Sequence, residues 1–119
     1  MAPVQNTAAA GWDRKRMLEQ LAGDEPLLQE IVQAFLEETP KMMASLRDAV
    51  RDANAGGVER TAHSLKLVLG YLGRPVASQT VRELEQMGRN GELKGAAEAF
   101  AITEAEIAAV TASMMSPAV

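Results

Sequence analysis

A chain of 119 residues is long enough for one domain with a single hydrophobic core, and the absence of cysteine excludes disulfides and thiolate chemistry. The net charge of −4 at pH 7 argues against a general nucleic-acid-binding protein, which needs a dense basic face to neutralise phosphates. No apolar run approaches the roughly 18 to 20 residues of a membrane span, and the sequence shows no signal-peptide pattern. We therefore expect a cytoplasmic protein without direct membrane contact.

The pattern of apolar residues favours helices over strands. Hydrophobic residues make up 47% of the sequence and aromatic residues only 3%, with few β-branched runs and no strand-like alternation. The sequence therefore predicts an all-α protein: an antiparallel four-helix bundle with a short extra N-terminal helix. We assign residues 12–115 to the bundle, residues 1–11 to a disordered leader or linker, and residues 116–119 to a frayed C-terminus.

The first two helices have clear start signals. Asp13 is the candidate N-cap of a short helix that Gly23 ends. Asp24, followed by Pro26 in the first turn, begins the next helix, because a proline there loses no backbone hydrogen bond. Apolar residues continue at helical spacing beyond Pro40, whose ring predicts a bend. Periodicity alone leaves open whether this stretch is one kinked helix or two helices.

The next helix bears the only histidine and is expected to run from about Gly57 to Leu72. At about 3.6 residues per turn its apolar residues fall along one stripe, which should face the core. His63 lies about 160° around the helix from Leu65, so we expect it to face outward. The predicted core stripe consists of Val58, Ala62, Leu65, Leu69 and Leu72.

Two further helices complete the predicted bundle. A fourth amphipathic helix should run from Val76 to roughly Met87, with a turn at Asn90-Gly91. The closing helix should run from about Leu93 to Met114 and is rich in alanine. Its expected apolar side consists of Leu93, Ala97, Phe100, Ile107 and Val110.

His63 and Lys66 together have the chemistry of a phosphoryl acceptor. A neutral imidazole nitrogen is a nucleophile near physiological pH, and Lys66 can offset the charge that builds on the phosphoryl oxygens. Glu85 comes twenty-two residues after His63, so an antiparallel hairpin returns it to the same level. There its carboxylate can engage Nδ1 and leave Nε2 as the nucleophile. The alternative is that Glu85 is a solvated charge beside Arg82 or Arg89.

The same residues resemble the signature of histidine phosphotransfer (HPt) domains, the modules of multistep phosphorelays. That signature reads roughly His-x-Leu-Lys-Gly-Ser/Ala-Ser/Ala-x-x-Leu-Gly, and this chain has His63, Leu65, Lys66, Leu72 and Gly73 in register. The flanking segments are also similar to those of HPt modules, so the resemblance covers roughly residues 13–112. These flanking segments are residues 24–28, 35–40 and 84–91.

The resemblance implies that His63 takes a phosphoryl group from an aspartyl-phosphate on one receiver domain and passes it to an aspartate on another. Lys66 would then contact the phosphate, and response-regulator receiver domains would be the partners, with a hybrid sensor kinase in cis as a further candidate. Chemotaxis-kinase phosphotransfer domains, which are similar, have a glutamate at the place of Glu85. No phosphate-cradling loop is present, so we expect a carrier without ATPase or kinase machinery.

We expect neither a cofactor nor a metal on this chain. Glu59 and His63 are one helical turn apart, but one carboxylate and one imidazole do not make a metal site. The Mg²⁺ of the reaction would belong to the partner receiver domain, whose acidic pocket needs a cation to accept the phosphoryl group.

Leu67 departs from the HPt pattern, which has glycine directly after the lysine. It lies four residues after His63 and thus on the same exposed face. Its branched side chain either crowds the receiver and slows transfer or serves as a hydrophobic anchor for the partner. We expect the partner-binding surface to include Arg60, Leu67, Gly70 and Arg74, with the arginines attracting the acidic pocket of a receiver.

Two other functions are compatible with the sequence. One is an interaction bundle of HPt shape that is not phosphorylated and docks a partner through the Leu67 face. The other is the phosphotransfer module of a chemotaxis-type kinase, which uses the same histidine chemistry but takes its phosphoryl group from an ATP-dependent kinase domain. The flanking segments favour the phosphorelay over the chemotaxis module.

Overall fold

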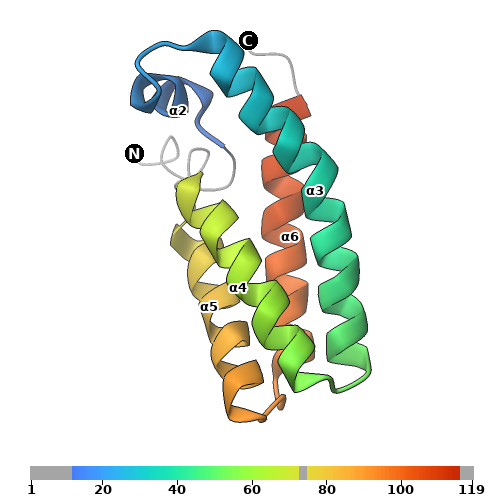
Figure 1. The fold of residues 1–119 in the computed structure, drawn as a ribbon. Helices are drawn as coiled ribbons and strands as arrows, with labels where there is room; N and C mark the ends of the chain where they lie inside the picture. The colour runs from blue at the N-terminus through green and yellow to red at the C-terminus, as the bar shows by residue number, and fades with distance from the viewer. Residues whose placement is uncertain (1–11, 73–74, 116–119) are drawn as a thin grey trace, which may run out of the picture.

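The computed structural model describes residues 12–72 and 75–115, which form five helices and no strand (Figure 1). The all-α prediction is confirmed. The expected leader at residues 1–11 and the expected frayed C-terminus at residues 116–119 lie outside the described residues. Within the described part of the chain, no helix is both long enough and apolar enough to cross a membrane.

Side-chain caps start the first two helices where the sequence places them. Helix α2 (Arg14–Gln20) is capped by Asp13, whose carboxylate accepts a hydrogen bond of 3.0 Å from the backbone N–H of Arg16. Helix α3 (Glu25–Arg51) is capped in the same way by Asp24, with 3.1 Å to the N–H of Leu27. Gly23, at φ +78°, makes the turn between them in a left-handed conformation that glycine adopts without strain.

Helix α3 is a single helix of 27 residues that continues through Pro40. This settles the question that periodicity left open. The missing hydrogen bond at Pro40 is tolerated because one face of the helix is held in the core along its length. That buried face consists of Leu28, Phe35, Thr39, Met43, Leu46 and Ala49.

Helix α4 (Ala55–Tyr71) carries the histidine. It begins two residues before the expected start, because Asn54 caps it by accepting a hydrogen bond of 3.0 Å from the N–H of Gly57. The predicted core stripe is confirmed: its five residues are between 0% and 8% exposed. Burial of this stripe fixes the rotation of α4 and turns the opposite face, with His63, toward solvent.

The bounds of the last two helices differ from the expected ones. Helix α5 (Pro75–Asn90) runs three residues further than Met87, up to the turn at Gly91. Helix α6 (Ala96–Met115) begins three residues after Leu93, because Gly95 has a φ of +88° and cannot belong to a right-handed helix.

The expected apolar side of α6 was partly wrong. Ala97 is exposed, and the buried face consists of Ala96, Ala99, Thr103, Ile107 and Val110. In a helix this rich in alanine, several faces have similar hydrophobicity, so the pattern alone does not choose between neighbouring alanines.

From α3 to α6, each helix runs antiparallel to the one before it, and α2 lies across one end of the bundle beside the start of α3 (Figure 1). The most extensive contact is between α4 and α5; α3 and α6 close the core from the other side. The backbone of Trp12 exchanges two hydrogen bonds of 3.2 Å with the hydroxyl of Ser113, which ties the start of the described chain to the end of α6.

Candidate functional site

His63 projects from the solvent-facing side of α4. Its side chain is 53% exposed, whereas Ala62 and Leu65 beside it are fully buried. The predicted outward position is therefore confirmed. A partner molecule can reach the imidazole without any rearrangement of the bundle.

Glu85, from α5, meets the imidazole at Nδ1. Its Oε2 lies 2.8 Å from Nδ1 of His63, and the glutamate side chain is only 5% exposed. The hydrogen bond from Lys66 holds the pKa of Glu85 below its usual range, against the opposing effect of burial; His63 lowers this pKa further. Glu85 is therefore ionised at neutral pH and can only accept hydrogen bonds.

An ionised Glu85 determines where the proton of the neutral imidazole resides. Because the carboxylate only accepts, Nδ1 of His63 must donate, and Nε2 carries the lone pair. Nε2 is thus the ring nitrogen available for nucleophilic attack on an exposed side chain.

Two cations share the carboxylate of Glu85 with the histidine. The ammonium nitrogen of Lys66 is 2.7 Å from Oε1, and its side chain is 25% exposed. Arg89, one turn beyond Glu85 on α5, places Nη2 3.2 Å from Oε2. The Nε of Arg89 donates to Glu59 on α4, also at 3.2 Å.

The sequence analysis assigned no site role to Arg89 or Glu59. The available signals were two i,i+4 spacings, Glu59 to His63 on α4 and Glu85 to Arg89 on α5. Neither spacing shows that the two helices bring all four side chains together. The sequence analysis also considered Glu85 as a solvated charge beside Arg82 or Arg89. Arg89 is indeed its neighbour, but the carboxylate is buried and not solvated.

Gly88 lets α5 approach α4 closely at the level of the site. A Cβ atom at this position would lie 2.5 Å from the backbone nitrogen of Glu59 and 2.7 Å from the backbone oxygen of Ala55. The backbones therefore touch where Gly88 lies, one turn from Glu85. This contact sets the short distance across which Glu85 reaches His63.

The expected partner-binding residues lie along the histidine face as far as the structure describes them. Arg60, Leu67 and Gly70 are exposed on α4, and Arg74 lies outside the described residues. Leu67 is 61% exposed, one of several large apolar side chains at the surface of the described part of the chain.

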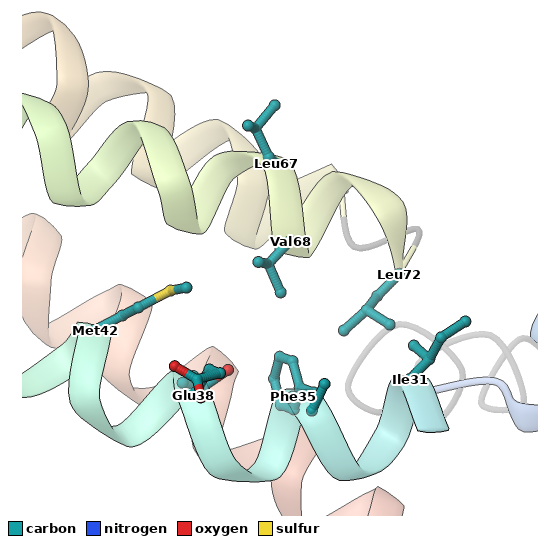
Figure 2. Close-up of a pocket in the computed structure, with 9 residues that line it drawn as sticks. Ile31, Phe35, Glu38, Met42, Leu67, Val68 and Leu72 are labelled. Atoms are coloured by element: carbon teal, nitrogen blue, oxygen red, sulfur yellow. The ribbon is translucent and has the colours of Figure 1, made fainter. Parts of the chain in front are cut away.

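An apolar groove opens between α3 and α4 beside this face (Figure 2). Its volume is about 410 Å³. Val68 and Leu72 point from α4 toward Phe35, while Leu67 lies at the rim and points outward. The groove is thus continuous with the face that carries His63. Its lining consists of Ile31, Ala34, Phe35, Glu38, Thr39, Met42, Leu67, Val68 and Leu72.

Within residues 12–72 and 75–115, no group of three or more His, Asp or Glu side chains is placed to hold a metal ion. The polar groups at the site are those of an imidazole, two carboxylates and two cations. Their arrangement fits a nucleophilic histidine that is oriented by a carboxylate.

A helical bundle that presents one oriented histidine to solvent has the arrangement that a histidine phosphotransfer domain needs. The family model of the Hpt domain matches residues 30–113, well over half of the chain. The chain therefore belongs to the Hpt domain family, whose members carry out histidine phosphotransfer in phosphorelays and interact with receiver domains. Comparisons with curated proteins and with solved structures found no match.

Proposed function

We propose that His63 is the phosphoryl acceptor of this domain: it takes the group from an aspartyl-phosphate on one receiver domain and passes it to an aspartate on another. The observation that carries this proposal is the 2.8 Å contact between Nδ1 and the buried carboxylate of Glu85. It leaves the lone pair on Nε2 of the single histidine in the chain, on a side chain that a receiver can reach.

In the forward step, Nε2 attacks the phosphorus of the aspartyl-phosphate. The N–P bond forms as the P–O bond breaks, and the receiver aspartate leaves as a carboxylate. Nδ1 keeps its proton, and Glu85 balances the positive charge that develops on the ring. Lys66, three residues along α4, turns from Glu85 toward the phosphoryl oxygens. The receiver supplies the Mg²⁺ of its own pocket, and neither ATP nor a cofactor on this chain takes part.

The receiver docks on the face that carries His63, Leu67 and Gly70, with Arg60 at its edge and Arg74 as a further contact. Support comes from the exposure of Leu67 and from the apolar groove beside it, which offers buried contact area close to the histidine. The arginines suit the acidic pocket of a receiver, because complementary charge speeds encounter.

Incubation with a phosphorylated receiver domain tests the proposal. We expect the label to move to this chain in a form that is labile in acid and stable in alkali, as phosphohistidine is, and mass spectrometry to locate it on His63. Absence of label from both a receiver and a small phosphodonor, with the fold intact by circular dichroism, contradicts the proposal.

A second candidate is a non-phosphorylated interaction bundle that docks a partner through the Leu67 face. The exposed leucine beside an apolar groove favours it, because this surface can bind a partner without any chemistry at His63. The same experiment separates the two functions: binding without label supports the interaction bundle, and label on His63 supports the relay.

We expect Leu67→Ala to weaken receiver binding roughly tenfold, the effect of removing an apolar anchor at an interface. Labelling by a small phosphodonor should stay at the wild-type rate, since a small molecule does not need the docking face. Isothermal titration calorimetry and the labelling rate are the two measurements. Ile102→Ala on α6, which truncates another exposed aliphatic residue, is the matched control. Faster transfer from the receiver in Leu67→Ala would show that Leu67 obstructs docking.

A further inference from the structure

Arg89 links the two helices of the site through two carboxylates. Its Nη2 is 3.2 Å from Oε2 of Glu85, and its Nε is 3.2 Å from Oε2 of Glu59. Glu85 lies on the same helix as Arg89, whereas Glu59 lies on α4 one turn before His63. The guanidinium is therefore linked to the imidazole through the carboxylate of Glu85, whose Oε2 accepts from both.

The two oxygens of Glu85 are occupied differently. Oε1 accepts from Lys66, whereas Oε2 accepts from both Nδ1 of His63 and Arg89. In the unphosphorylated chain, two cations thus neutralise one buried carboxylate. Because Arg89 also pairs with Glu59, the two cations balance two carboxylates in this state.

The proposed reaction changes this balance. A phosphoryl group on Nε2 brings negative charge beside Lys66, which is three residues away on α4 and closer to solvent than Glu85. Once Lys66 turns to the phosphoryl oxygens, Glu85 has only Nδ1–H and Arg89 as partners. If Arg89 were also missing, the buried carboxylate would have no side-chain cation besides the ring, which favours its protonation or its movement toward water, and either change weakens its hold on the imidazole.

We propose that Arg89 is a positioning residue that keeps Glu85 charged and bound to Nδ1 of His63 while Lys66 is engaged by the phosphoryl group. Glu59 in turn orients the guanidinium by accepting from Nε. The part that concerns the phosphoryl group rests on the proposed function. The part that concerns the imidazole is a property of the unphosphorylated chain and can be measured there.

Removal of Lys66 imitates its departure from Glu85. We therefore compare Lys66→Ala, Arg89→Gln and the double variant by ¹⁵N NMR of the imidazole ring, above the pH range in which the imidazole titrates. Every imidazole signal belongs to His63, because the chain has no other histidine. The ring nitrogen shifts report the ratio of the Nδ1–H to the Nε2–H tautomer.

Each single variant should keep the Nδ1–H tautomer in excess, because one cation still holds Glu85. The double variant should lower the tautomer ratio roughly tenfold, as expected for the loss of a hydrogen bond to a charged group. Adding Glu59→Gln to Lys66→Ala should give a smaller decrease, since Arg89 is then present but loses its second anchor. This combination also tests the proposal if the double variant does not fold.

Two controls separate positioning from a general structural effect. Arg89→Lys in the Lys66→Ala background keeps a cation near Glu85 and should restore most of the tautomer ratio. Arg82→Gln in the same background removes an exposed arginine of the same helix and should leave the ratio unchanged. A wild-type ratio in the folded double variant, or an equal decrease with Arg82→Gln, overturns the assignment of Arg89. Neither outcome depends on whether His63 accepts a phosphoryl group.

Discussion

Replacement of His63 by glutamine is expected to abolish phosphoryl transfer to this chain. The chain has no other imidazole, and the amide of glutamine has no nucleophilic lone pair to replace Nε2. The nucleophile itself is missing in this variant. We therefore expect no acid-labile label on His63→Gln after incubation with either a phosphorylated receiver or a small phosphodonor. The measurement is label per chain after incubation with each donor.

The fold should survive this substitution. His63 is 53% exposed, and substitutions at exposed positions usually change the free energy of unfolding by no more than about 0.5 kcal/mol. The glutamine amide is also a donor that can still reach the carboxylate of Glu85. Ser64→Ala, a change at the exposed neighbouring position, is the control and should be labelled at the wild-type rate. Acid-labile label on His63→Gln would place the acceptor elsewhere in the chain and refute the assignment.

Among the substitutions predicted for this protein, Gly88→Ala is expected to destabilise the fold most, with a loss of about 1–3 kcal/mol in the free energy of unfolding. The added Cβ would meet the backbone of Glu59 and Ala55 at 2.5 and 2.7 Å, and backbone atoms within a helix cannot give way as a flexible side chain can. Helix α5 must therefore move away from α4. This movement should also weaken the contact between Glu85 and Nδ1 of His63, which spans the same two helices.

Urea denaturation measures the first effect, and the tautomer ratio of His63 by ¹⁵N NMR measures the second. Gly56→Ala is the matched control, because Gly56 is also helical but its added Cβ would meet side chains and no backbone: the far end of Arg60 at 3.2 Å and Oδ1 of Asn54 at an ordinary contact distance of 3.8 Å. Alanine is the better helix former by about 1 kcal/mol, so this control should be as stable as the wild type or more stable. Equal stabilities of the two variants would show that the close approach at Gly88 is not a constraint.

The local features of the fold could be predicted because they depend on residues close together in the sequence. Asp13 and Asp24 cap the helices that follow them, and the core stripe of α4 is buried as its spacing requires. The outward position of His63 follows from the same spacing. The start of α6 was misplaced by three residues, because the decisive feature is the left-handed backbone of Gly95, which no apolar pattern records.

The amino-acid sequence by itself determined the helices, the buried face of α4 and the exposure of His63, because each depends on a periodic pattern within one helix. The tertiary structure alone decided that Glu85 is buried, that Arg89 and Glu59 join the site, and that a groove lies beside Leu67. The groove arises where α3 and α4 pack together, whereas the contacts of Glu85, Arg89 and Glu59 arise from the distance between α4 and α5. That distance depends on side-chain volume at their contact, above all on the missing side chain of Gly88, and not on the period of either sequence.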